Sequence, residues 1–176
     1  MGMFDSVYLD AEAAKLVRCV HEHPQEMAEL QTKSLDSTGT HYYVVKVQLY
    51  RQAPWIPGRA IGVIEPYGPE GSFYLVDRTL LLKSDLTATI RGYTHCHQCL
   101  AVVYDTGRED MWTGSLDSRR PWLEWELIFT YGVLQETRPI KLESRDEVKA
   151  GLERRGLRVL DDQDPLATRY RAQHRS

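Results

Sequence analysis

The segment WLEWELIFTYGVL (122–134) constrains the fold most strongly, because large apolar side chains recur in it at every second residue. Successive side chains of a β-strand point to opposite sides, so such a period places them on one face. Five residues would share that face: Leu123, Trp125, Leu127, Phe129 and Tyr131. The segment predicts a core strand, with Glu124 and Glu126 on its solvated side.

Further strands are predicted on either side of a long loop. Residues 41–50 (HYYVVKVQLY) are rich in Tyr and Val and alternate in the same way. Residues 51–71 contain four prolines and four glycines, which predict a loop with at most a short strand at 61–64. Residues 72–83 are predicted to form one or two strands. Residues 86–95, followed by 100–106, read as a hairpin with two cysteines at its turn.

Helical patterns are confined to two places. Residues 9–30 contain helix formers through Arg18 but are interrupted by Pro24, so a helix would end at or before His23. Residues 143–156 begin with Ser144 as an N-cap, have a glutamate three residues later and stop at Gly156. The polar segment 107–121 predicts turns. Together these elements predict an α+β fold with a mainly antiparallel sheet and one or two helices.

Length and composition favour one domain without a strong surface charge. We expect a single β-rich domain over residues 1–160, followed by a polar C-terminal tail over 161–176. The formal net charge is −3, from 22 Lys+Arg against 25 Asp+Glu, which gives no global attraction to nucleic acid. The sequence shows neither an apolar run long enough for a membrane helix nor a secretory signal at its start. An odd count of three cysteines suits reduced thiols or metal ligands, which favours the cytoplasm.

The segment THCHQC (94–99) holds the strongest candidate site. Cys96 and Cys99 have the spacing at which a turn directs two thiolates toward one metal ion. The remaining cysteine, Cys19, lies beside His21 and His23, and Cys19 with either histidine would complete a tetrahedral zinc site. His95 and His97 are alternative ligands, although their position next to Cys96 makes joint ligation harder.

Two other interpretations of the cysteines stay open. Cys96 and Cys99 would be ordinary reduced thiols near a turn if the histidines are simply solvated. A redox dithiol is disfavoured, because a thioredoxin-like Cys-x-x-Cys should open a helix after a strand, whereas a β-rich segment follows here. The metal interpretation would make the turn a zinc-ribbon-like knuckle with a structural zinc ion.

The N-terminal forty residues carry a resemblance to a family. MGMFDSVYLD and the later LQTKSLDS are similar to the start of small, largely uncharacterised phage and prophage proteins, in which MFD and a short strand precede a Cys-x-x-Cys and a phrase like FQTKDLDC. The matching positions are Met3, Phe4, Asp5, Val7, Gln31, Thr32, Lys33, Leu35 and Asp36. The chain departs from the pattern by keeping only Cys19 of the first pair and by having Ser37 in place of a cysteine. The resemblance implies a mobile-element origin and a zinc-ribbon-like module, and it implies no activity.

Signatures of known catalytic chemistry are missing from the sequence. It contains no GxSxG motif, and GPEGS and GRAIG do not fit the phosphate-loop patterns. Aromatic and arginine residues in two loops, QAPWIPGR and DMWTGSLDSRRPW, instead suggest contacts with a partner. The candidate partner-binding residues are Trp55, Arg59, Trp112, Arg119 and Arg120.

Three classes of function follow from these patterns. The favoured one is a non-enzymatic phage or mobile-element accessory protein that binds a host protein or protein complex, as an anti-CRISPR-like inhibitor of a defence system would. The alternative is a zinc ribbon that binds nucleic acid through arginines. Its candidate residues are Arg91, Arg119, Arg120, Arg154 and Arg155. An enzyme of unrecognised type is the third class.

Overall fold

The computed structural model describes residues 4–20, 28–53, 60–65, 74–96, 98–110 and 114–174. The chain divides into two compact units, and each consists of two separate stretches of sequence. The barrel unit contains residues 1–94 and 123–142, and the αβ unit contains residues 95–122 and 143–176. The chain leaves the barrel unit after β7 and re-enters it at β10, and the single domain over 1–160 stays a prediction.

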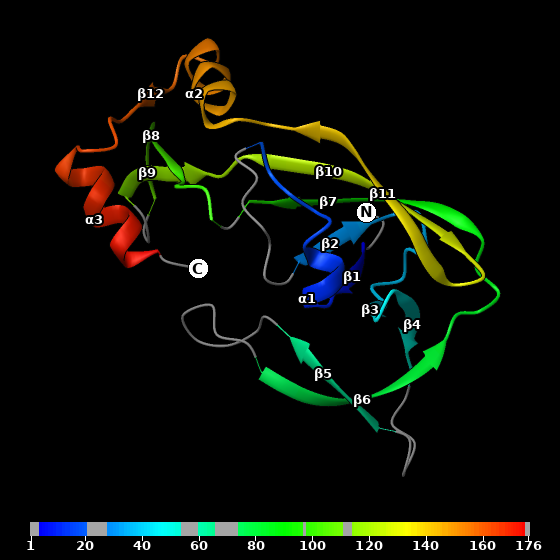
Figure 1. Ribbon diagram of the computed structural model, residues 1–176. Coiled ribbons are helices and arrows are strands. Elements are labelled where there is room, and N and C mark those ends of the chain that lie inside the picture. The colour runs from blue at the N-terminus through cyan, green and yellow to red at the C-terminus, as the bar shows by residue number, and fades with distance from the viewer. Residues whose placement is uncertain are drawn as a thin grey trace. The chain divides into compact units, whose positions relative to one another are not determined.

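Seven strands of the barrel unit form a closed barrel (Figure 1). In spatial order they are β11 (Val133–Leu142), β10 (Trp122–Thr130), β7 (Ala88–His95), β2 (Ala28–Thr32), β1 (Asp5–Leu9), β3 (His41–Val45) and β4 (Gln48–Gln52). Pairing of Val133 in β11 with Gln48 in β4 closes the ring. Two further strands, β6 (Tyr74–Leu82) and β5 (Ala60–Glu65), extend the sheet from β4.

The predicted predominance of antiparallel β-structure is confirmed, although the sheet closes into a barrel. Strands make up 50% of the structure and helices 17%. The pairs β1–β2, β2–β7, β3–β4 and β10–β11 are antiparallel, whereas β1 and β3 are parallel. The predicted strand at 61–64 corresponds to β5, and residues 72–83 form one strand, β6.

Alternating residues of the barrel strands supply its core. In β10, Leu123, Trp125, Leu127 and Phe129 are buried, as the sequence predicts. Strand β1 is buried on both faces, since Val7 and Leu9 are buried as well as Tyr8. On the Tyr8 face, Tyr8 stacks on Tyr43 of β3 with ring centroids 5.1 Å apart, and both pack against Leu80 of β6 in a separate cluster. Full burial of a large apolar side chain contributes about 1.5–3 kcal/mol to folding, so this regular pattern is a major source of stability.

Strand β10 ends one residue before Tyr131, which corrects the prediction that Tyr131 lies in the core. Tyr131 and Gly132 form the two-residue turn between β10 and β11, with φ values of 51° and 73°. Two consecutive positive φ angles are typical of the type I′ turns that match the twist of hairpin strands. The side chain of Tyr131 is consequently 73% exposed.

A second turn of the same kind lies beside the first. Lys46 and Val47 join β3 to β4 with φ values of 47° and 62°. The amide of Leu134 donates to the carbonyl oxygen of Val47 at 2.7 Å, and the amide of Leu49 donates to that of Gly132 at 2.8 Å. These bonds join the two left-handed turns where the barrel closes.

Asp5, in the MFD motif, has a structural role. Its carboxylate is fully buried and accepts hydrogen bonds from the amides of Ser37, Thr38 and Thr40 at 2.6, 3.0 and 2.9 Å. A buried carboxylate requires such partners. Asp5 therefore fixes the loop that follows QTKSLD, in which Ser37 adopts a positive φ of 54°.

The αβ unit places a small sheet between two helices (Figure 1). The sheet order is β12 (Arg158–Val159), β8 (Val102–Asp110) and β9 (Gly114–Arg119). Val102 packs against Val148 and Leu152 of α2 (Arg145–Arg154), whereas its neighbour Val103 packs against α3 (Pro165–Gln173). Adjacent residues of β8 thus serve two cores, because they point to opposite faces.

Helix α2 follows the predicted capping signals. The Ser144 hydroxyl accepts from the amide of Glu147, and the Glu147 carboxylate accepts from the amide of Ser144, which forms a capping box. Gly156, just beyond the helix, has a φ of 75°. Local sequence alone specifies both ends of this helix.

The C-terminal segment contains a helix, α3, where the sequence analysis expected a polar tail over 161–176. Asp164 caps the helix by accepting from the amide of Leu166, and Pro165 occupies its first turn. Ala167 and Tyr170 are buried against Val103. Helix α3 buries only a narrow face and therefore needs few apolar residues. For this reason its sequence shows little apolar periodicity.

Four other predictions differ from the structure. Residues 41–50, predicted as one strand, form β3 and β4, which the turn at Lys46 and Val47 separates. Strands β7 and β8 belong to different sheets, so residues 86–95 and 100–106 form no hairpin. The segment 107–121 is predicted to form turns. Most of its described part instead lies in the end of β8 and in β9, which pair with each other. The helix expected within 9–23 is limited to α1 (Ala11–Ala14), which Asp10 caps.

Candidate metal centre and its surroundings

The three cysteines of the chain lie close together. The Sγ atoms of Cys19, Cys96 and Cys99 are all within 4.8 Å of one another, and the residues are 2%, 0% and 3% exposed. Zn–S bonds of about 2.3 Å in a tetrahedron place sulfur atoms about 3.8 Å apart, so small side-chain rotations would suffice to bind a metal. The three cysteines could therefore hold a metal ion, and three thiolates suit a soft or borderline cation.

The Cys96–Cys99 turn is fixed at its N-terminal side. It follows directly after β7, and the amide of Cys96 donates to the carbonyl oxygen of Pro121 at 3.0 Å. The His95 ring meets the Trp122 ring edge to face, with centroids 5.0 Å apart. Among the described residues, the candidate metal ligands are the three cysteines alone, so His95 is not grouped with them.

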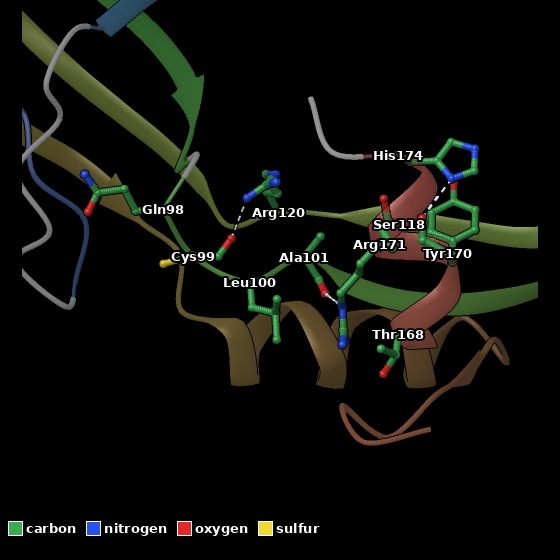
Figure 2. A pocket seen from close by; sticks show the side chains of 11 residues that line it. Gln98, Cys99, Leu100, Ala101, Ser118, Arg120, Thr168, Tyr170, Arg171 and His174 are labelled. Carbon is green, nitrogen blue, oxygen red and sulfur yellow. Dashed lines mark hydrogen bonds between the residues drawn. The ribbon is translucent and has the colours of Figure 1, made fainter. Parts of the chain in front are cut away.

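Arginines bind three consecutive carbonyl oxygens at the C-terminal side of the turn. Arg120 donates to Cys99 at 2.6 Å, Arg145 to Leu100 at 2.7 Å and Arg171 to Ala101 at 3.0 Å. Figure 2 shows the contacts of Arg120 and Arg171. Charge-assisted hydrogen bonds are stronger than neutral ones, so these contacts hold residues 99–101, which precede β8, in a defined path.

One aspartate positions two of these arginines. Asp162 Oδ1 accepts from Arg145 at 2.6 Å and from Arg171 at 2.7 Å, and Lys149 lies 3.6 Å from Oδ2. The hydrogen bond from Arg145 is the main cause of a lowered pKa of Asp162. Asp162 thus links α2, through Arg145 and Lys149, to α3, through Arg171.

The predicted partner-binding residues are only partly described. Trp55, Arg59 and Trp112 lie outside the described residues, as do the candidate ligands His21, His23 and His97. Arg119 forms a bidentate pair with Glu143 at 3.0 Å, and the same carboxylate accepts from the amide of Trp122. Arg119 and Arg120 thus have structural contacts within the αβ unit.

Acidic residues pair with another arginine of the proposed nucleic-acid surface. Arg91 lies 3.5 Å from Glu124 and 3.9 Å from Glu126 on the neighbouring strand. The two glutamates share one face of β10 as predicted, and both pair there with Arg91. The pairing also reduces the positive charge that Arg91 presents to a phosphate backbone.

Sequence reasoning missed the roles of Tyr131, Arg145 and Arg171. In the dipeptide Tyr131-Gly132 only the glycine indicates a turn. The apolar alternation of β10 includes Tyr131, so the sequence pattern predicts that the strand continues through it. No local pattern marks the contacts of Arg145 and Arg171, because their carbonyl partners are 45 and 70 residues away in sequence.

None of the described helices is long and apolar enough to span a membrane. No protein-family model, curated protein or solved structure matches the chain.

Proposed function

We propose that the chain is a non-enzymatic accessory protein of a phage or other mobile element, which binds a host protein or protein complex. The observation that carries this proposal is the exposed Tyr131. A bulky residue with positive φ is uncommon and costs conformational energy, and such outliers are concentrated at functional sites. Asparagine or glycine would form the same turn without the cost, so the aromatic ring is the feature that the turn presents.

Backbone hydrogen bonds hold the turn that carries Tyr131 on the barrel unit. The amide of Tyr131 donates to Thr87 Oγ1 at 3.0 Å, and that of Gly132 donates to the carbonyl oxygen of Leu86 at 2.7 Å. Tyrosine is enriched at the centres of protein interfaces, where a rigid aromatic ring provides much contact area.

We also propose that the metal held by the three cysteines is a structural zinc ion. Complete burial of the thiols fits a closed site better than a catalytic one, which keeps an open position. Cys19, Cys96 and Cys99 supply three ligands, and His21 or His23 is the preferred fourth from its position near Cys19. His97 is the alternative. Such an ion would fix residue 19 to the Cys96–Cys99 turn and add its binding energy to folding.

Cobalt substitution tests the ligand set. Co²⁺ bound to thiolates gives intense charge-transfer absorption, which should weaken in Cys19→Ser, Cys96→Ser and Cys99→Ser alike. Separate His21→Ala, His23→Ala and His97→Ala variants identify the fourth ligand by the change in the cobalt d–d bands. Unaltered spectra in all three cysteine variants would contradict the proposed site.

Partner binding is tested by photo-crosslinking in cells of a bacterial host. A photoreactive phenylalanine analogue at position 131 should form a defined protein adduct, whereas the same analogue at Leu166, which is 54% exposed on α3, should not. The same adducts from both positions, or none from position 131, would contradict a partner site at Tyr131. Adducts that disappear after nuclease treatment would support the nucleic-acid alternative instead.

The narrower proposal is that the partner is part of a host defence complex. It is supported by the resemblance of the N-terminal residues to phage proteins. Expression of the chain in a bacterium with active CRISPR interference should restore plaque formation by a targeted phage, and a Tyr131→Ala variant should not. Full interference in the presence of the wild-type chain would contradict this inhibitor role and leave the crosslinking test of binding unaffected.

A further inference from the structure

The αβ unit contains a cavity of about 430 Å³ beside the Cys96–Cys99 turn (Figure 2). Residues of the turn and of the chain after it, the end of β9 and one side of α3 form its walls. This volume falls in the range of about 300–1,000 Å³ that is usual for sites of small ligands. All of the lining residues belong to the αβ unit.

The polar side chains of the lining can all donate hydrogen bonds, and Arg120 and Arg171 are cations. Besides Cys99 and Tyr170, they are Gln98, Ser118, Arg120, Thr168, Arg171 and His174. Among the described residues, no carboxylate side chain lines the cavity. The lining therefore favours an anionic group over a cationic one.

The two guanidinium groups are already held in position. Arg120 is bonded to the Cys99 carbonyl oxygen, and Arg171 is bonded to Ala101 and to both the carbonyl and the carboxylate of Asp162. The side chain of Arg171 is only 13% exposed. A ligand would meet donors that need little further ordering, which reduces the entropic cost of binding.

An aromatic pair lies across the cavity from Arg120 (Figure 2). The rings of Tyr170 and His174 stack with centroids 4.1 Å apart and an interplanar angle of 16°. Ala172 and the half-exposed Leu100 add apolar surface. A flat ring can pack against this surface, while its anionic substituent reaches the arginines.

We propose that this cavity binds a small organic anion composed of a flat aromatic ring and a phosphate or carboxylate group. The anionic group lies toward Arg120 and Arg171, and the ring lies against Tyr170 and His174. The proposal rests on the αβ unit alone and is separate from partner binding through Tyr131.

Binding is measured by NMR titration of the isotope-labelled full chain with matched probes. AMP and indole-3-carboxylate contain both a ring and an anion, whereas adenosine lacks the anion and inorganic phosphate lacks the ring. We expect AMP, indole-3-carboxylate or both to bind at least about tenfold more tightly than adenosine and phosphate, since each part adds contacts. The difference between the two anionic probes distinguishes phosphate from carboxylate ligands.

A pair of variants at Ala172 locates the binding without removing any native contact. Ala172 is exposed on α3 and lines the cavity, and both Glu and Lys are good helix formers. Ala172→Glu should weaken binding by about tenfold through charge repulsion, whereas Ala172→Lys should preserve or strengthen it. Arg138→Met, which removes an exposed arginine from β11, should leave binding unchanged.

Two results would overturn the proposal. The first is the absence of saturable shifts with both ring-containing anions. The second is binding that responds equally to Glu and Lys at position 172, which would place the probe elsewhere. The Tyr131→Asn variant should bind these probes as the wild type does, so failure here and failure of partner binding are distinguishable.

Discussion

Replacing Tyr131 with asparagine should stabilise the protein while it removes the proposed contact with a partner. Tyr131 has a φ of 51° and begins a two-residue turn that Gly132 completes at 73°. Asn-Gly is the preferred sequence for such a turn, because both residues tolerate positive φ. The substitution thus relieves local strain and deletes an exposed ring.

The size of the effect follows from the geometry. A left-handed conformation costs an ordinary L-residue about 1–2 kcal/mol, and asparagine avoids much of this cost. The Tyr131 side chain is 73% exposed, so its removal sacrifices few contacts, and exposed substitutions usually change stability by less than about 0.5 kcal/mol. We expect a net gain of about 1 kcal/mol, equivalent to a rise in Tm of about 3 °C for a chain of this size.

Urea unfolding monitored by circular dichroism measures the change in stability, and crosslinking or co-purification measures binding. Tyr131→Phe is the first control, since it keeps both the ring and the strain and should resemble the wild type in stability. Tyr131→Ala should lose binding without the gain in stability. An unchanged or lower midpoint for Tyr131→Asn would refute the strain argument, and retained partner binding would refute the role of the ring.

Three further substitutions test the fold. Asp5→Ala leaves the amides of Ser37, Thr38 and Thr40 without their buried acceptor and should lower the free energy of unfolding by about 3 kcal/mol in urea melts; a loss below about 1 kcal/mol would contradict its role. Gly132→Ala places a Cβ 2.2 Å from a backbone carbonyl oxygen at a φ of 73° and should cost at least about 2 kcal/mol. Its control Gly107→Ala has a φ of 66° and open space around the added Cβ, so it should cost about 1 kcal/mol. Asp162 has a lowered pKa because Arg145 donates to it. Its contribution to stability is therefore complete above about pH 4 and is lost as the pH falls through its lower folded pKa. Asp162→Asn should destabilise the protein at pH 6 and much less at pH 3, and equal differences at both values would argue against the ion pair.

Local sequence was sufficient where one element contains all of its own signals. Ser144 and Glu147 cap α2 within a single turn, and Gly156 follows its last turn. The alternation of β10 predicted its buried face for the same reason. Closure of the barrel instead depends on pairing between Val133 and Gln48, which are far apart in sequence and show no mutual signal.

The candidate metal centre was more predictable than its surroundings. Cys-x-x-Cys and the scarcity of other cysteines suggested that Cys19 joins Cys96 and Cys99, and their sulfur atoms do lie together. The arginine contacts with residues 99–101 could not be anticipated. Arginine occurs on most protein surfaces, and only the packing of α2 and α3 beside β8 brings Arg145 and Arg171 to these carbonyls.

The metal content of the purified protein tests the central claim most directly. Elemental analysis of protein prepared without added zinc should find one zinc ion per chain. Cys19→Ser and the double variant Cys96→Ser/Cys99→Ser should each lose that zinc together with thermal stability, as should the wild type treated with a chelator. A wild-type protein that contains no metal and that is as stable as both variants would contradict the account, because the three buried cysteines would then be ordinary thiols.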